Sequence, residues 1–201
     1  MPITINGSGT LTGISAGGYP DGSVTDADLA STLDFSGKTI NNWPIASGLF
    51  SAYAKLEDQK SNGTAAGQNT TPSAWRVRDL NTEVFDPSNI VTLSSNRFTL
   101  QAGSYLIVYR VPQYRPDKLR AALYNYTDSS YAGYSENVYG HSSYFQQLYV
   151  EGKTRVTIAS AKEFEIRHWS NVQVNSEDLG RPLSISGVPE IYTTVEIYKE
   201  N

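Results

Sequence analysis

One stretch of the chain, residues 124–144, concentrates side chains that could make specific contacts. It holds six tyrosines among serine, asparagine and glycine residues. Tyrosine offers a large contact area and a hydroxyl with little loss of side-chain entropy, and this mixture is typical of adaptable binding loops. We therefore expect a receptor or ligand contact here; the alternative is a tyrosine-rich strand pair packed where subunits meet. The candidate contact residues are Tyr126, Tyr131, Tyr134, Tyr139, His141 and Tyr144.

The sequence lacks the patterns that carry known catalytic chemistry. His168 lies beside Trp169 in an alternating stretch with no nucleophile pattern, so we expect a hydrogen-bonded packing histidine there. The acids Asp117, Asp128 and Glu136 lie near expected loops, but their spacing singles out no pair for glycoside cleavage. We expect no enzymatic activity and no catalytic residues.

Composition excludes several other functional classes. The 201 residues include no cysteine and only two histidines, and no dense Asp/Asn loop suggests calcium, so we expect no metal and no cofactor. A net charge of -4 argues against nucleic-acid binding. No apolar run is long enough to span a bilayer, and the first residues lack a signal-peptide pattern. The expectation is a soluble protein without membrane insertion.

From Trp75 onward the sequence predicts short strands separated by turns. The strongest covers 104–111, where apolar residues occupy both alternating faces, so we expect both faces to be buried. Residues 51–60 fit a helical turn or an extended strand equally well. Such regular spacing of strands is typical of an antiparallel sandwich or jelly roll, so we expect an all-β fold. The other expected strands are 75–79, 89–93, 97–100, 118–126, 143–150, 153–158, 163–169 and 190–199.

The N-terminal residues differ from the rest of the chain. Residues 1–50 hold half of the 16 glycines and read as an extended attachment arm or linker, followed by a jelly-roll domain at 51–201. Thr25 and Asp28 form a capping pattern before spaced leucines, which predicts one short helix in the arm. The alternative is a flexible tail.

Two segments of the predicted jelly roll resemble a known family. Residues 96–107, with the sequence NRFTLQAGSYLI, resemble the "F…G-x-Y" strand pair of the complement globular-head and tumour-necrosis-factor-like jelly rolls. Residues 191–199 are similar to that family's closing strand, which lies near a trimer axis. The resemblance implies a homotrimer.

Other segments resemble virion proteins of tailed phages. Residues 6–15 and 20–30 resemble the linker region of tail-fibre proteins, and 74–83 and 164–168 resemble the C-terminal trimeric domain of the same group. This resemblance implies a virion structural protein, made in the cytoplasm of the bacterial host.

Trimer formation also follows from the apolar character of both strand faces. An exposed apolar sheet face favours association, and a closed three-fold interface leaves no open edge. The alternative is that the same residues line the core of one monomer. The candidate interface residues are Tyr105, Tyr109, Tyr192, Ile197 and Tyr198.

These observations lead to three functional hypotheses. The first is a trimeric tail fibre or tail-associated adhesin that contacts the host surface. The second is a capsid decoration protein that stabilises or studs the head, and the third is a lectin-like secreted module. The expected partners are further copies of the chain, other virion proteins bound through residues 1–50, and a glycan or protein of the host surface.

Overall fold

The computed structural model describes residues 48–201. The helix expected after Thr25 lies outside the described residues, and the division into an arm and a jelly-roll domain stays a prediction. The described strands are β1 (Phe50–Lys60), β2 (Ala74–Val77), β3 (Thr82–Phe85), β4 (Val91–Ser94), β5 (Arg97–Leu100), β6 (Gly103–Tyr114), β7 (Lys118–Asn125), β8 (Ser130–Tyr134), β9 (Val138–Tyr139), β10 (Gln147–Ile158), β11 (Lys162–Ser170) and β12 (Glu190–Glu200).

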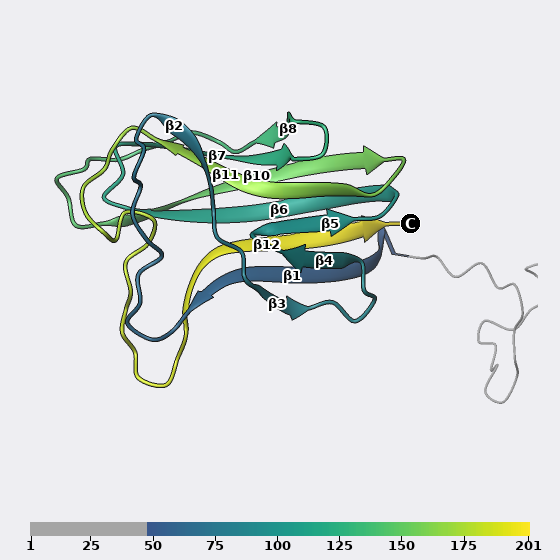
Figure 1. The fold of residues 1–201 in the computed structure, drawn as a ribbon, viewed down its shortest axis with the longest axis horizontal. Coiled ribbons are helices and arrows are strands. Elements are labelled where there is room, and N and C mark those ends of the chain that lie inside the picture. Colours follow the sequence, from purple (N-terminus) through teal and green to yellow (C-terminus); the bar gives the residue numbers. More distant parts are fainter. Residues whose placement is uncertain (1–47) are drawn as a thin grey trace, which may run out of the picture. The chain divides into compact units, whose positions relative to one another are not determined.

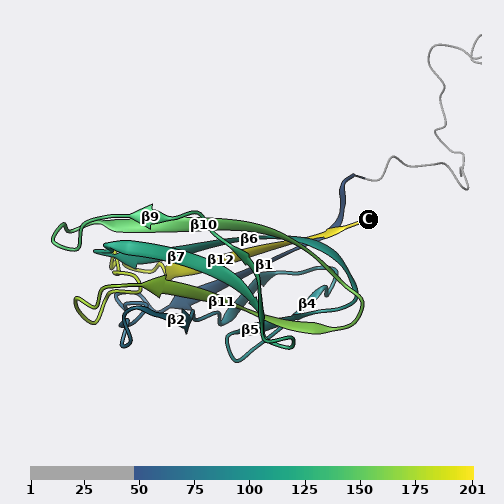
Figure 2. The ribbon, with the colours of Figure 1, turned by 90° about the horizontal axis from the view of Figure 1, so that it is seen from above.

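The strands form two antiparallel sheets (Figures 1 and 2). A five-stranded sheet has the order β10-β6-β12-β1-β3, and a seven-stranded sheet contains β4-β5-β11-β7-β8, with β2 attached to β11 and β9 attached to β7. Without the short β2, β3, β4 and β9, the orders are β1-β12-β6-β10 and β5-β11-β7-β8. This is the double Greek-key arrangement of a jelly roll, so the expected all-β antiparallel sandwich is confirmed.

Alternation along the strands places the core between the two sheets. Tyr105, Ile107 and Tyr109 of β6 point inward and are buried, and they pack in one cluster with Phe164 and Ile166 of β11. The intervening positions of β6, Leu106 and Val108, are partly exposed on the outer face. The expectation that both faces of this strand are buried is therefore wrong for the described chain.

A glycine explains one strand whose length the sequence did not predict. Stretches 143–150 and 153–158 were expected as separate strands, but β10 runs unbroken from Gln147 to Ile158. Gly152 lies opposite Tyr109, and a Cβ added to it would lie 2.2 Å from the tyrosine ring. The glycine makes room for the ring and does not end the strand.

Candidate functional site

The tyrosine-rich segment lies largely on the outer face of the seven-stranded sheet. Strand β7 pairs with β8, so Tyr124 lies opposite Tyr131, and Tyr134 lies opposite Ala122. The ring centroids of Tyr131 are 5.0 Å from Tyr124 and 5.2 Å from Tyr134, and Trp75 is 5.2 Å from Tyr131. Three strands therefore contribute to one continuous aromatic surface.

Arginine side chains cover these tyrosine rings. The guanidinium carbon of Arg167 lies 3.3 Å from the centroid of Tyr124, and that of Arg97 lies 3.3 Å from the centroid of Tyr126. Contacts of this kind are attractive because the ring face carries partial negative charge. The segment therefore supplies an arginine–tyrosine surface instead of a free loop of tyrosines.

Glu165 holds two of the arginines in place. Its carboxylate accepts hydrogen bonds from Arg97 at 3.0 Å and Arg167 at 2.7 Å, and the residue is only 1% exposed. It points to the outer face, since its neighbours Phe164 and Ile166 point into the core. Each of these two guanidinium groups therefore already has an anionic partner within the chain, although the single carboxylate balances only one of the two positive charges.

A pocket of about 440 Å³ opens on the same sheet. This volume lies within the range of small-molecule sites. Its lining is mostly apolar, with two indoles and two cations and no carboxylate. The lining residues are Trp75, Lys118, Leu119, Arg120, Asn137, Val138, Tyr139 and Trp169.

Strand register builds this pocket from four separate segments. Trp169 of β11 pairs with Trp75 of β2 on one side and with Arg120 of β7 on the other. Lys118 of β7 pairs with Tyr139 of β9. Directly paired residues lie on the same face of a sheet, so the two tryptophans and Arg120 form one cross-strand row.

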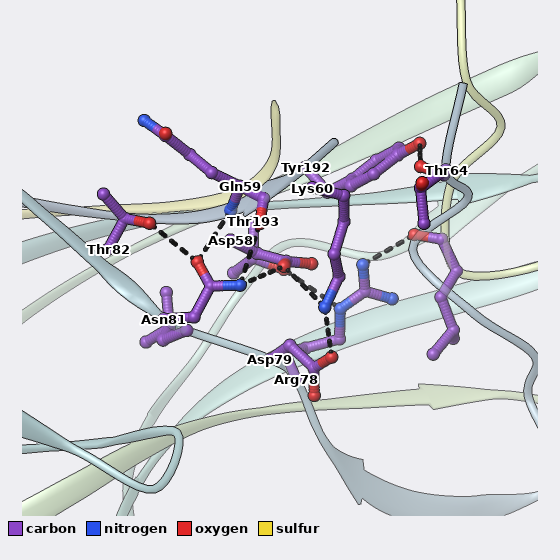
Figure 3. Close-up of polar contacts among 12 residues, drawn as sticks. Asp58, Gln59, Lys60, Thr64, Arg78, Asp79, Asn81, Thr82, Tyr192 and Thr193 are labelled. Carbon is purple, nitrogen blue, oxygen red and sulfur yellow. Dashed lines mark hydrogen bonds and ion pairs between the residues drawn. The ribbon is translucent and has the colours of Figure 1, made fainter. Parts of the chain in front are cut away.

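A polar network around the buried Arg78 fixes the chain where β2 ends (Figure 3). We infer that it also holds Trp75, which lies in β2. Arg78 directly follows β2 and is 1% exposed. Its Nε donates to Thr193 at 3.0 Å, and another guanidinium nitrogen donates to the carbonyl of Leu179 at 2.6 Å. Its backbone N–H donates to the carbonyl of Ile166 at 2.8 Å. Strand β2 is thereby attached to β12 and to the loop before it.

Nearby acids keep the buried cation charged. Burial lowers the pKa of Arg78 to about 10, while Asp58 and Asp79 oppose that shift. Burial raises the pKa of Asp58, and Lys60, whose Nζ lies 3.1 Å from the carboxylate, opposes that change. The guanidinium therefore carries its charge at neutral pH inside the fold.

His168 is a packing residue, as expected, but it is not hydrogen-bonded as expected. It lies on the inner face of β11, is 1% exposed, and neither ring nitrogen meets a hydrogen-bond partner in the described chain. Burial lowers its pKa well below 6.5, and the charges of Arg78 and Arg76 lower it further. A neutral histidine with no contact to the pocket has no visible role in binding.

The structure brings together only part of the predicted contact set. Tyr139 lines the pocket, and Tyr131 and Tyr134 lie beside Trp75. His141 and Tyr144 pair with each other, with centroids 4.8 Å apart, and are not among the lining residues. Trp75, Trp169, Arg97 and Arg167 were missed, because their only sequence signal is strand alternation.

Four of the five predicted interface residues lie inside the single chain. Tyr105, Tyr109 and Ile197 belong to the sandwich core, and Tyr192 is 3% exposed, with its hydroxyl donating to the carbonyl of Thr64. These four side chains have almost no exposed surface that another subunit could contact. They fit the alternative hypothesis, in which the same residues line the core of one monomer. Only Tyr198 is partly exposed.

Tyr198 belongs to an aromatic cluster on the outer face of the five-stranded sheet. Its ring centroid is 5.2 Å from that of Phe50 and 5.0 Å from that of Tyr53, and Tyr53 is 5.9 Å from Phe85. Phe85 is 51% exposed. We refer to Phe50, Tyr53, Phe85 and Tyr198 as the aromatic cluster.

Residues 48–201 contain no group of three or more His, Cys, Asp or Glu side chains placed to hold a metal ion. In the same residues there is no helix with the length and apolar character needed to cross a membrane.

The chain is similar to several solved structures in fold. The crystal structure of murine APRIL at pH 5.0 aligns with a TM-score of 0.49 and 6% identity, over 74% of this chain and 98% of that one. The globular domain of zebrafish complement 1qA protein aligns with a TM-score of 0.46 and 15% identity, over 73% and 95%. Eiger TNF from S. frugiperda aligns with a TM-score of 0.45 and 11% identity, over 75% and 92%.

No family model matches the sequence, and no curated protein matches it. The likeness to the solved structures concerns the fold alone, which the strand order already defines.

Proposed function

We propose that this chain is a homotrimeric virion protein of a tailed phage, a tail fibre or tail-associated adhesin that contacts the host surface without catalysis. The observation that carries the contact role is the outer face of the seven-stranded sheet. There an open pocket lies beside tyrosines stacked with arginines. The virion role is supported by the resemblance of residues 6–15 and 20–30 to tail-fibre linkers.

The aromatic cluster supports self-association. It lies on the other sheet, so a subunit contact there leaves the pocket open. The same face carries both charge signs, with Lys55 opposite Glu196 and Arg110 opposite Glu151. Subunit contacts in a closed ring of three copies are heterologous, so one part of this face would meet a different part of the neighbouring copy. Aromatic area together with charges of both signs suits such a contact, because a cation of one copy can face an acid of the next.

Gold labelling of intact particles tests the virion role. An antibody against residues 75–201 is applied to purified phage particles whose genome encodes this sequence. Gold on the tail or its tip is the expected result. Gold spread over the head would make the chain a capsid decoration protein and overturn the adhesin role, and unlabelled particles would overturn the virion role.

A further inference from the structure

We propose that the pocket between Trp75 and Trp169 binds an acidic sugar, one whose ring carries a carboxylate. The inference deepens the proposed function and rests on it, since it names the chemistry of the host surface that the adhesin would contact. It follows from the pairing of an aromatic platform with uncompensated positive charge.

The two indoles supply a platform for a sugar ring. Trp75 and Trp169 are both partly exposed, lie opposite each other in register, and face the pocket from neighbouring strands. A pyranose has one face of C–H groups, which packs on an aromatic ring and leaves the hydroxyls at its edge free for hydrogen bonds. Tryptophan suits this arrangement because its large apolar face carries a polar N–H at its edge.

Lys118 and Arg120 supply charge that nothing in the described chain neutralises. Both are exposed, and neither forms an ion pair within residues 48–201. Arg120 donates one hydrogen bond, from its Nε to the carbonyl of Ser135 at 3.3 Å, and its guanidinium carbon lies 4.9 Å from the ring centroid of Tyr134. Arg97 and Arg167 differ, because Glu165 already occupies them. The free pair therefore favours an anion, and a guanidinium matches the geometry of a carboxylate.

The rest of the lining suits a hydroxylated ligand. Asn137 and Tyr139 are exposed, and within the described residues their side-chain polar atoms form no hydrogen bond. An amide and a phenol can each donate to and accept from sugar hydroxyls. A purely apolar ligand would leave these groups and both cations unused.

Nucleic acid fits the site less well than a saccharide. Recognition of a phosphate backbone uses a stripe of cations, whereas the pocket has two and the chain as a whole carries a net charge of -4. An acidic sugar carries one carboxylate on one ring. Its ring can pack on the two indoles while its carboxylate contacts the two cations beside them.

The test uses the full chain and immobilised oligomers of glucuronate, galacturonate, mannuronate and sialate. Each acid is presented beside its methyl ester, which keeps the stereochemistry and removes the charge. We expect at least one acid to bind about tenfold or more tightly than its ester, as the loss of charge-assisted hydrogen bonds requires. Equal binding of acid and ester, or binding of no acid, would overturn the inference.

Variants separate the platform from the charge. The double variant Lys118→Gln/Arg120→Gln changes exposed side chains and is expected to lower binding of the acid to the level of the ester. Trp169→Ala is expected to weaken binding of both. The control is Arg76→Gln, an exposed cation of β2 that forms no ion pair in the described residues and does not line the pocket, and this variant should bind as the parent does. Unchanged binding by the first double variant contradicts the inference.

The outcomes distinguish this inference from the proposed function. Gold on the tail without preference for any acidic sugar overturns the ligand and keeps the adhesin. A preference for an acid that depends on Lys118 and Arg120, together with gold on the head, keeps the ligand and overturns the tail location.

Discussion

Arg78 is a buried cation that joins segments far apart in the sequence. It links the end of β2 to Thr193 in β12 and to the carbonyl of Leu179, beside the acid Asp58 of β1. Removing one partner from such a network leaves the remaining polar groups buried without compensation. The residue therefore matters for the position of Trp75 as well as for stability.

Replacing Arg78 tests this role. Arg78→Met is expected to lower the free energy of unfolding by about 3 kcal/mol, because the acceptors Thr193 and Leu179 lose their donor. Urea denaturation followed by tryptophan fluorescence measures the change. Arg76→Met is the matched control, since Arg76 is exposed and bonds only Thr71, and its effect should stay within about 0.5 kcal/mol. Equal effects of the two variants would contradict the network's role.

His168 predicts a specific pH dependence of stability. Burial depresses its pKa in the folded chain well below 6.5, the ordinary value that it regains on unfolding. Above pH 6.5 both states are neutral at this residue, and below it the unfolded state takes up a proton that the folded state refuses. The free energy of unfolding should therefore fall by up to about 1.4 kcal/mol per pH unit as the pH drops below 6.5.

Denaturation midpoints at pH 7.5, 6.5 and 5.5 measure this effect. The variant His168→Gln should lose most of the fall between pH 6.5 and 5.5, because glutamine does not titrate. His141→Gln, which alters the exposed histidine of the loop before β10, should retain it. A flat profile in the parent chain would show that His168 takes up its proton in the folded state.

At the scale of strands, Gly152 makes room for a buried ring of the neighbouring strand β6 in the same sheet. It lies in the middle of β10, where an added Cβ would meet the ring of Tyr109 at 2.2 Å. Gly152→Ala should lower the free energy of unfolding by about 2 kcal/mol, because a buried ring must move to accept one methyl group. Thermal unfolding measures the loss. Gly48→Ala is the control, since its nearest neighbouring atom lies 4.0 Å away, and it should be neutral.

The strands with clean alternation could be predicted from the sequence. Stretch 163–169 alternates large apolar and polar residues, and it forms β11. The strands β3 and β9 could not be predicted, because neither has a buried position, and without a buried face the sequence shows no alternation. The equally short β5 was predicted, because its positions alternate between buried and partly exposed. In 104–111 the residues of both strand faces are apolar. The sequence shows which residues share a face, but it does not show which face points into the core.

The sequence predicted the candidate site only where its residues lie close together in the chain. Tyr131, Tyr134 and Tyr139 lie close together in the chain, so their composition alone indicated a contact surface. Trp75 and Trp169 lie far apart in sequence, and only the pairing of β2 with β11 brings them together. A pocket formed by strand register has no local signature that a single sequence could reveal.

At the scale of the whole molecule, the aromatic cluster predicts the oligomeric state. A hydrogen bond to Glu196 raises the pKa of Tyr198 to about 12, so its phenol is neutral and donates to Glu196 at 2.6 Å. Light scattering of the parent chain should give about three times the 22.1 kDa of one chain. Tyr198→Glu places a second carboxylate beside Glu196 and should give single chains that remain folded.

Tyr139→Glu is the matched control for that measurement. It makes the same change at an exposed residue of the other sheet and should leave the mass unchanged. A parent chain that remains at 22.1 kDa would overturn the trimer, and a trimeric Tyr198→Glu would exclude the aromatic cluster as its seam.

The placement of the pocket and the aromatic cluster on different sheets has a consequence for binding strength. In the proposed trimer every pocket stays open, so one particle presents its sites in sets of three. Linked sites that engage one repetitive surface gain avidity of roughly 10²- to 10⁴-fold over a single site, without any new contact. Each pocket can therefore be weak enough to release its sugar quickly while the assembly as a whole holds to the surface.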